Sequence, residues 1–189
     1  NFLERIYTED EFDYKSYKIS DLNFNLIPDQ NLIVLNELES ISSALKVALT
    51  TFKKDGGSIL IIPSDKVSLN TYNQKFKDLS LFPFIELNDR QKRITSINYN
   101  HPLLKNAFYS KVSNFQYPKV EGFFPLKASI GATMLSFEDG KPFLIQQNKS
   151  YLFTAPLNEE NSNFIHSDLV VTLYAIARNS LKPIDLYYT

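Results

Sequence analysis

The sequence predicts an α/β fold built around a mixed sheet, and three patterns along the chain lead to this prediction. Two short apolar runs, at 31–38 and 58–64, flank a stretch with helical periodicity. Strand-like segments separated by turn residues follow at 132–157. The stretch 163–180 repeats its apolar residues at helical spacing, which predicts a C-terminal helix.

The two apolar runs and the stretch between them form a strand, helix, strand unit. The runs NLIVLNEL and SILIIPS lack polar alternation, as is typical of strands covered on both faces. The apolar residues between them fall on one helical stripe: Ile41, Leu45, Ala48, Leu49 and Phe52. Ser40 is a suitable N-cap for this helix, and Gly56-Gly57 supplies its left-handed end. Such a unit implies that its two strands pair in parallel.

The remaining elements follow from the same periodicities. Helices are expected at 1–12, 68–80 and 101–109, and strands at 14–22 and 93–99. The segment 112–126 is broken by prolines and a glycine and is expected to be irregular. Asp139-Gly140 and Asn148-Lys149 are turn signals. They separate three antiparallel strands, expected at 132–137, 142–147 and 151–157.

Composition excludes several classes of protein. Hydrophobic residues make up 43% of the 189 residues, which is enough apolar surface for one folded domain over 1–189. The net charge is -1 and the basic residues are scattered among 21 acids, so no basic patch is available for nucleic acid. No cysteine is present, which excludes disulfides, thiol nucleophiles and cysteine-bound zinc.

Motifs for cofactors, metals and membranes do not occur either. The 5 glycines are too dispersed for a GxGxxG or Walker loop, so no nucleotide cofactor is expected. His101 and His166 lie far apart and no HExxH motif or EF-hand loop is present, so no metal site is expected. No apolar run reaches the roughly 18 residues that span a bilayer. The chain begins with Asn1, so it is expected to be excised from a longer protein.

One constellation could support catalysis. Ser64 ends a buried run, and the carboxyl ends of parallel strands are where α/β folds form their sites. His166 and Asp168 lie near the start of the last predicted helix. In this hypothesis Ser64 is the nucleophile, His166 is its base, and Asp168 or Glu159 orients the imidazole. The chain would then be a serine-type hydrolase.

Ser64 also has a structural interpretation, which the sequence favours. A nucleophile elbow needs small neighbours because the turn is strained and a helix packs close to it. The neighbours here are Pro63, Asp65 and Lys66. Ser64 and Asp65 are equally suited to a turn, or to an N-cap before the helix near Leu69.

The second hypothesis is a surface for binding rather than catalysis. Aromatic side chains beside amides are typical of protein interfaces, and they occur together in the segments 112–126 and 156–164. The residues predicted for this surface are Phe123, Phe124, Asn158, Glu159, Asn161 and Asn163. The alternative is that the aromatic residues fill the core. A third option is a carbohydrate or small-ligand site at the strand ends, formed by Asn158, Glu159, Asn161, Asn163 and His166.

Several segments together resemble a known family. They are 31–38, GGSILIIPS at 56–64, TYNQKF at 71–76, HPLLKNAF at 101–108, YPKVEGFFPL at 117–126, and 139–180. These segments resemble the C-terminal class I glutamine-amidotransferase-like domain of BatA-type membrane proteins of Bacteroidetes. The resemblance covers the chain from about Asn1 to Ser180, and LFTAPLNEENSNFIHSD at 152–168 is its most specific part.

The resemblance implies a flavodoxin-like three-layer sandwich, with a mixed, mostly parallel sheet and a C-terminal antiparallel hairpin region. The parent proteins carry transmembrane segments and a von Willebrand A-like domain, and the family is associated with aerotolerance. The domain is expected on the periplasmic side of the cytoplasmic membrane, anchored by segments outside this chain. Its expected partners are other subunits or domains of that membrane-anchored complex, including the von Willebrand A-like domain.

The family's fold also places a catalytic cysteine after the strand that matches 58–63, and a His-x-Glu pair near the C-terminus. This chain has Ser64 at the first place and His166-x-Asp168 near the second. Without the thiol, and without glycines at the turn, glutaminase chemistry lacks its nucleophile. The resemblance therefore implies a non-catalytic interaction or scaffold domain that uses no cofactor.

The family's fold normally opens with a strand before its first helix, whereas this chain begins at or near that helix. Three alternatives stay open: the first strand is trimmed, is disordered, or is replaced by 14–22 at the sheet edge. An uncovered edge would invite pairing with another chain.

Overall fold

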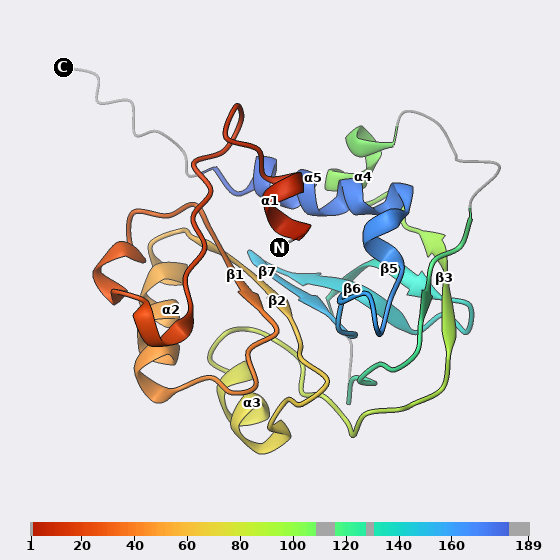
Figure 1. Ribbon diagram of the computed structural model, residues 1–189, viewed down its shortest axis with the longest axis horizontal. Helices are drawn as coiled ribbons and strands as arrows, with labels where there is room; N and C mark the ends of the chain where they lie inside the picture. Colours follow the sequence, from red (N-terminus) through yellow and green to blue (C-terminus); the bar gives the residue numbers. More distant parts are fainter. Residues whose placement is uncertain (1, 109–115, 128–130, 182–189) are drawn as a thin grey trace.

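The chain folds around one sheet of seven strands, in the order β1-β2-β7-β6-β5-β3-β4 (Figure 1). This computed structural model describes residues 2–108, 116–127 and 131–181. The strands are β1 Leu32–Asn36, β2 Ser58–Ile62, β3 Lys92–Ile97, β4 Lys119–Val120, β5 Ala132–Phe137, β6 Pro142–Gln147 and β7 Ser150–Phe153. The helices are α1 Phe2–Ile6, α2 Ser43–Lys54, α3 Leu69–Phe76, α4 Pro102–Ala107 and α5 Val171–Asn179. The prediction of an α/β fold with a mixed sheet is confirmed.

Parallel pairing is confined to one side of the sheet. β1 pairs with β2 and β2 with β7 in parallel, whereas β7, β6, β5, β3 and β4 pair with one another antiparallel. The prediction of a mostly parallel sheet is therefore wrong. Tight turns with positive φ at Gly140 (79°) and Asn148 (53°) join β5, β6 and β7, and such short connections force neighbouring strands to run antiparallel.

The predicted strand, helix, strand unit is confirmed in β1, α2 and β2. Their register pairs Leu32 with Ser58 and Asn36 with Ile62. The N-cap of α2 is Ser42, whose side chain accepts from the amide of Leu45, and not Ser40 as predicted. Beyond the end of α2, Gly56 has a φ of 89°, which a glycine adopts without steric cost.

The C-terminal helix begins later than its periodicity predicts. Two 3₁₀ turns, Phe164–His166 and Asp168–Val170, precede α5. Between them Ser167 has an extended backbone (ψ 162°), and its side chain accepts from the amide of Leu169 at 3.3 Å. This local cap competes with the continuous helix that the apolar spacing favours.

The predicted strand at 14–22 does not form. The segment contains only a 3₁₀ turn at Ile19–Asp21 and runs beside β1 without joining the sheet (Figure 1). Residues 15–21 are all exposed, so the segment has no buried face that would select a strand register.

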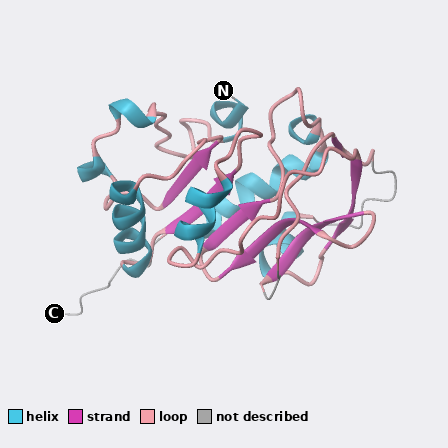
Figure 2. Ribbon diagram, turned by 90° about the horizontal axis from the view of Figure 1, so that it is seen from below, coloured by secondary structure: helices cyan, strands magenta, loops and turns pink. Residues whose placement is uncertain are grey.

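Each face of the sheet carries its own apolar cluster, and helices cover both (Figure 2). Leu60 and Ile62 of β2 belong to the first cluster, which also holds residues of α1, α4 and α5. Ile59 and Ile61 belong to the second cluster, with residues of α2 and α3. Since successive strand residues point to opposite faces, the unbroken apolar run in β2 supplies both clusters. No helix among the described residues is long and apolar enough to cross a membrane.

Candidate functional site

The carboxyl ends of three parallel strands meet at one edge of the sheet. Glu37 follows β1, Ser64 follows β2, and Asn158 follows β7. In open α/β sheets this edge is where ligands bind, so its side chains form the first candidate site, the strand-end site.

Ser64 lies at this edge but is engaged in a turn. Its side chain is buried, with 7% of the residue exposed. The hydroxyl donates to Asp65 Oδ1 (3.3 Å) and accepts from the amide of Lys66 (3.1 Å), while the carbonyl accepts from Val67 (3.3 Å). These are the contacts of a turn residue, as the neighbours of Ser64 in the sequence indicate.

His166 faces a different partner. It ends the 3₁₀ turn Phe164–His166, and its Nε2 lies 3.3 Å from Glu159 Oε1. Both side chains are mainly exposed, so this contact contributes little to stability. Asp168 is exposed and opens the next turn. Among the described residues no hydrogen bond connects Ser64 with His166 or Asp168. Of the four residues of the predicted catalytic constellation, the structure brings together only His166 and Glu159.

The asparagines of the 156–164 segment hold the loop in place. Asn161 Oδ1 accepts from the amide of Gly122 (2.8 Å), and its Nδ2 donates to the carbonyls of Gly122 (3.0 Å) and Pro156 (2.9 Å). Asn163 Oδ1 accepts from the amide of Lys119 (2.7 Å). These two side chains therefore fasten the loop to β4 and the segment after it. Both ends of the Asn161 amide are engaged, whereas Asn163 is exposed and uses its oxygen.

The predicted contact surface is wrong for Phe123 and Phe124. They are 1% and 2% exposed, so neither ring can reach a partner. Phe123 lies in the first cluster with its ring centroid 5.1 Å from that of Phe137, and Phe124 stacks on Phe84 in the second cluster at 4.9 Å. The two neighbours point to opposite faces because the backbone is extended there, and the core interpretation of these aromatic residues is the correct one.

Glu37 is a strand-end residue that the sequence interpretation missed. Its backbone is left-handed (φ 55°), which is uncommon for a residue other than glycine and costs about 1–3 kcal/mol. The amide donates to Ile62 of β2 (2.8 Å), and Oε1 accepts from Asn158 Nδ2 (2.7 Å). A polar residue directly after a buried run was the available signal, but nothing in the sequence marks the left-handed conformation.

The strand-end site offers the Glu37 carboxylate and the Asn158 amide, which suit a polar ligand, whereas the Ser64 hydroxyl is engaged in its turn. The described residues contain no group of three or more His, Asp or Glu side chains placed to bind a metal ion.

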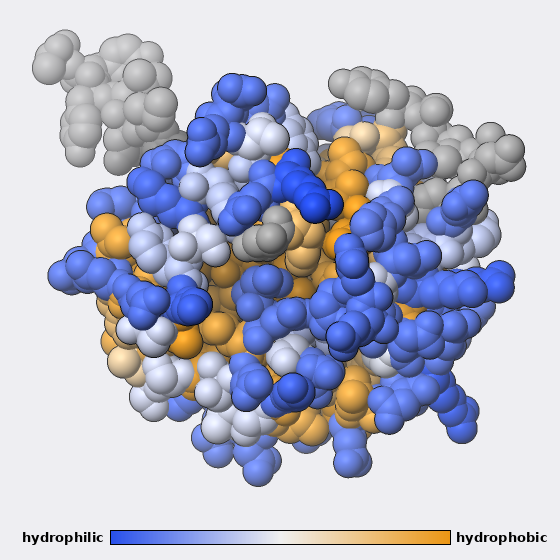
Figure 3. Space-filling model, in the orientation of Figure 1, coloured by the Kyte–Doolittle hydropathy of each residue, from blue (hydrophilic) through white to orange (hydrophobic). Residues whose placement is uncertain are grey.

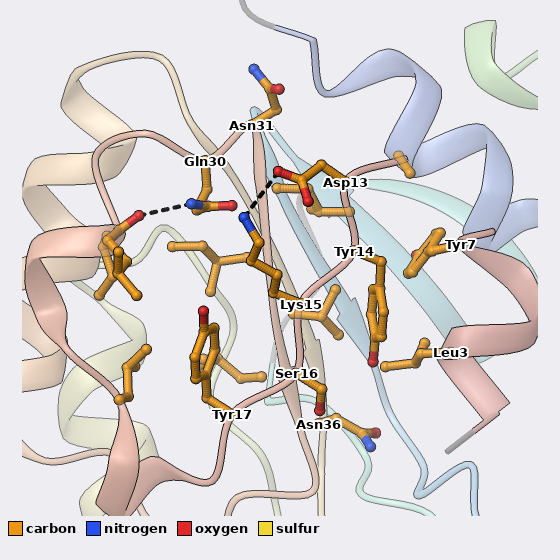
Figure 4. Close-up of a pocket in the computed structure, with 18 of the residues that line it drawn as sticks. Leu3, Tyr7, Asp13, Tyr14, Lys15, Ser16, Tyr17, Gln30, Asn31 and Asn36 are labelled. Carbon is orange, nitrogen blue, oxygen red and sulfur yellow. Dashed lines mark hydrogen bonds and ion pairs between the residues drawn. The ribbon is translucent and has the colours of Figure 1, made fainter. Parts of the chain in front are cut away.

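A second candidate is a groove of about 570 Å³ that runs along β1, here called the β1 groove (Figure 4). Its volume lies within the range of about 300–1,000 Å³ that is typical of ligand sites. Phe12 to Tyr17 and Ile19, the outer segment, form its outer wall. Tyr17, Ile19 and Leu26 are 49%, 46% and 37% exposed, and Figure 3 shows apolar surface among polar side chains on this face.

Polar side chains also line the β1 groove. Lys15 Nζ lies 3.0 Å from Asp13 Oδ2, and Gln30 Nε2 donates to the carbonyl of Leu26 at 2.8 Å (Figure 4). Asn36 Oδ1 is buried and has no hydrogen-bond partner within the described part of the chain. The sequence did not predict this groove, because the groove forms only where the outer segment packs beside β1.

Comparison with known proteins gives the fold and no more. No family model matches the chain, and no curated protein matches it by sequence. A ThuA-like protein from Bacteroides uniformis is similar in structure, with a TM-score of 0.64 and 16% identity over 95% of this chain and 80% of that one. The N-terminal domain of mmIFT52 has a TM-score of 0.59 and 12% identity, covering 95% and 91%.

A β-galactosidase from the psychrophilic Marinomonas ef1 is also similar, with a TM-score of 0.54 and 13% identity. The match covers 79% of this chain but only 20% of the β-galactosidase, so the likeness concerns one part of that enzyme. At these identities the comparisons describe architecture only. None of the three is described as a BatA-type protein, so that resemblance stays a prediction.

Proposed function

We propose that this chain is a non-catalytic, amidotransferase-like interaction domain that binds a protein partner in the β1 groove. The observation that carries the proposal is the groove itself, with exposed Tyr17 and Ile19 in its outer wall. Exposed aromatic and aliphatic side chains beside a hollow of this size are typical of binding sites.

The contacts of Ser64 support a role without catalysis. In the predicted hydrolase His166 is the base for Ser64, whereas in the structure His166 pairs with Glu159 and the Ser64 hydroxyl is engaged by its turn neighbours Asp65 and Lys66. The detailed fold class is part of the same proposal. Helices on both faces of the sheet and the likeness to a ThuA-like protein support a flavodoxin-like, three-layer class I amidotransferase architecture.

The cellular setting is also part of the proposal and rests on the resemblance to BatA-type proteins. In that setting the domain lies on the periplasmic side of the cytoplasmic membrane, held there by segments outside this chain. Its partner is then another subunit or domain of the same complex, such as the von Willebrand A-like domain.

Photo-crosslinking in cells tests the proposal. A benzophenone amino acid is placed at Tyr17 in the full-length protein, and at Val47 as a control, which is exposed on α2 and does not line the groove. We expect a discrete adduct with another protein or domain from position 17 and none from position 47. Absence of the adduct at 17, or equal adducts at both positions, would contradict the proposed binding surface.

The non-catalytic part has its own test. A fluorophosphonate probe is expected to leave Ser64 unlabelled, because its hydroxyl is buried in turn contacts with Asp65 and Lys66 and His166 pairs with Glu159 instead. Labelling that disappears in Ser64→Ala would establish the serine hydrolase instead.

The strand-end site favours a second candidate function, binding of a small polar ligand or carbohydrate. The specific observation is the left-handed Glu37 paired with Asn158 at the carboxyl ends of the parallel strands. Galactose is a suitable first probe, given the likeness to part of a β-galactosidase. The Asn158 side-chain amide signals should then shift on titration with galactose and stay unchanged in Glu37→Ala. Unchanged signals in the wild-type protein would rule out galactose at this site.

A further inference from the structure

The backbone of β1 is paired on one side only. The amide of Ser58 donates to the carbonyl of Asn31 at 3.0 Å. The amide of Glu37 donates to Ile62 at 2.8 Å, at the other end of the same ladder. In a parallel ladder the amide and carbonyl of one residue point to the same side, and alternate residues point to opposite sides. Odd-numbered residues of β1 therefore bond to β2.

The even-numbered residues Leu32, Val34 and Asn36 present their amides and carbonyls to the β1 groove. β1 is the first strand in the sheet order, so this side is a free edge. Within the described residues, no hydrogen bond reaches these backbone groups from the outer segment or any other part of the chain. Asn36 adds a side-chain oxygen that is buried and unpartnered at the carboxyl end of the same edge. An extended backbone is the ligand that matches donors and acceptors repeated at every second residue.

The groove has the size of a short strand. A residue in a sheet occupies about 160 Å³, from a strand spacing of about 4.8 Å, a layer spacing of about 10 Å and a rise of about 3.3 Å. A volume of about 570 Å³ therefore holds three or four residues. This length is one or two residues shorter than the stretch of 5 residues from Leu32 to Asn36, along which the free backbone groups lie, so it covers most of that edge.

Apolar side chains line the groove on both faces of the sheet. Those of the first cluster are Leu3, Tyr7 and Ala177. Those packed in the second cluster are Ile27, Leu38 and Leu45. A strand seated here would contact apolar surface through all of its side chains, so consecutive Val, Ile and Leu residues suit it, as in a strand covered on both faces.

The position of the outer segment indicates which occupant the β1 groove can take: a single added strand rather than a second folded copy of the chain. Figure 4 shows the part that carries Asp13, Lys15 and Tyr17 alongside β1, and these residues line the groove. Edge-to-edge pairing of two folded sheets needs an uncovered edge. A wall beside the edge hinders another sheet but admits a free extended segment.

We infer that the β1 groove binds an extended, apolar segment of another protein as an added strand, paired backbone to backbone with Leu32, Val34 and Asn36. This inference rests on the proposed function and names its binding mode. The segment becomes the new edge of the sheet, between β1 and the outer segment, and supplies the hydrogen bonds that these three residues lack.

Amide exchange in the wild-type chain tests the inference directly. The probe is a synthetic peptide with the core Val-Ile-Val-Leu-Val between pairs of lysines. We expect it to slow exchange of the Val34 and Asn36 amides by roughly tenfold or more, as a new backbone hydrogen bond does. The control peptide carries an N-methyl group on every core residue and should protect neither amide. Protection by the methylated peptide, or no protection by the parent peptide, overturns the inference.

A matched pair of variants at one position adds an independent measurement. Val34→Pro removes the outward amide from the edge, and edge strands tolerate proline where the amide is not bonded. Val34→Thr keeps the amide and a β-branched side chain. We expect Val34→Pro to weaken binding of the parent peptide by roughly tenfold and Val34→Thr by less than about threefold. Equal affinities for the two variants count against strand pairing, and the exchange experiment decides the matter if Val34→Pro does not fold.

Other occupants are recognisable outcomes. Protection of Val34 that grows with the concentration of the chain alone identifies a second copy and overturns the inference. Protection in the free chain that is independent of concentration identifies the outer segment as the pairing strand and overturns it too.

The failure of this inference is distinguishable from the failure of the proposed function. If the crosslink from position 17 forms and Val34→Pro leaves it unchanged, strand addition is wrong while the interaction function stands. If the peptide protects Val34 but no crosslink forms in cells, the proposed function is wrong and the strand site stands.

Discussion

One side-chain amide, that of Asn161, holds two loops together. It bonds both the amide and the carbonyl of Gly122, a buried residue, and also the carbonyl of Pro156. The strand-end site depends on this contact, because the same loop carries Asn158. The loop is therefore placed by hydrogen bonds to a distant segment rather than by its own turn sequence.

We expect Asn161→Ala to lower the free energy of unfolding by roughly 2–3 kcal/mol, because it leaves buried backbone groups without partners. Asn163→Ala is the matched control, since Asn163 is exposed and its side chain accepts one hydrogen bond, from the amide of Lys119. Its cost should be about 1 kcal/mol or less, because water can replace that bond. Urea denaturation compares the two. Equal losses would show that the loop is not held by the Asn161 amide.

We expect His101 to make the stability of the chain depend on pH. It is buried, and its Nδ1 accepts from the amide of Leu103 at the start of α4. Burial lowers the pKa of His101 below its usual 6.5, and a hydrogen bond with Gln146 opposes this in part. The unfolded chain therefore takes up a proton more readily, and stability falls as the pH drops below about 6.5.

His101→Asn keeps a capping acceptor at this position and removes the titration. The wild-type protein should lose stability relative to this variant between about pH 7 and about pH 5. Urea denaturation at several pH values measures the difference in unfolding free energy. A difference that does not change with pH would show that His101 does not titrate on unfolding.

At the scale of residues, the sequence was informative where chemistry is local. The neighbours of Ser64 favour a turn, and the structure gives it turn contacts. Phe123 and Phe124 were misplaced because their burial depends on which clusters the sheet brings to them. The left-handed Glu37 could not be predicted, since its conformation is supported by Ile62 and Asn158, both distant in sequence.

At the scale of elements, the junction from α2 to β2 depends on a close approach. A Cβ on Gly57 would overlap the ring of Phe52, which is itself fully buried. Gly57→Ala should therefore cost about 1–3 kcal/mol through overpacking, and Phe52→Leu should relieve part of that cost. Gly140→Ala is the control, because its Cβ would meet nothing within 4 Å and only its φ of 79° is unfavourable.

A double-mutant cycle between Gly57→Ala and Phe52→Leu, measured by urea denaturation, should give a favourable coupling of about 1 kcal/mol. Gly140→Ala should show no coupling with Phe52→Leu. Additive costs in the first cycle would mean that the ring of Phe52 moves aside freely and does not restrict this junction.

Periodicity predicted elements with a buried side and failed for elements without one. The stripe of α2 and the run of β2 each face packed neighbours, and both were predicted correctly. The segment 14–22 was predicted as a strand but is mostly exposed, so it has no surface that would hold it in a ladder. The balance of parallel and antiparallel pairing was also missed, because periodicity within a strand carries no information about its neighbour's direction.

At the scale of the whole molecule, β7 joins two kinds of sheet. It pairs in parallel with β2 and antiparallel with β6, and all of its residues are buried. Tyr151 and Phe153 belong to the first cluster and Leu152 to the second. The parallel and antiparallel parts therefore share this strand and both cores, which predicts that they unfold together.

Leu152→Ala tests this coupling. A cavity at a fully buried leucine should lower the free energy of unfolding by about 2–5 kcal/mol, whereas Val47→Ala on the exposed side of α2 should change it by less than about 0.5 kcal/mol. The slowest-exchanging amides of β2 and of β5 exchange only when the molecule opens globally, if the sheet is one cooperative unit. Leu152→Ala should then reduce their protection by the same factor, although β5 does not pair with β7. A loss confined to β2 and β7 would instead show that the antiparallel part unfolds as a separate unit.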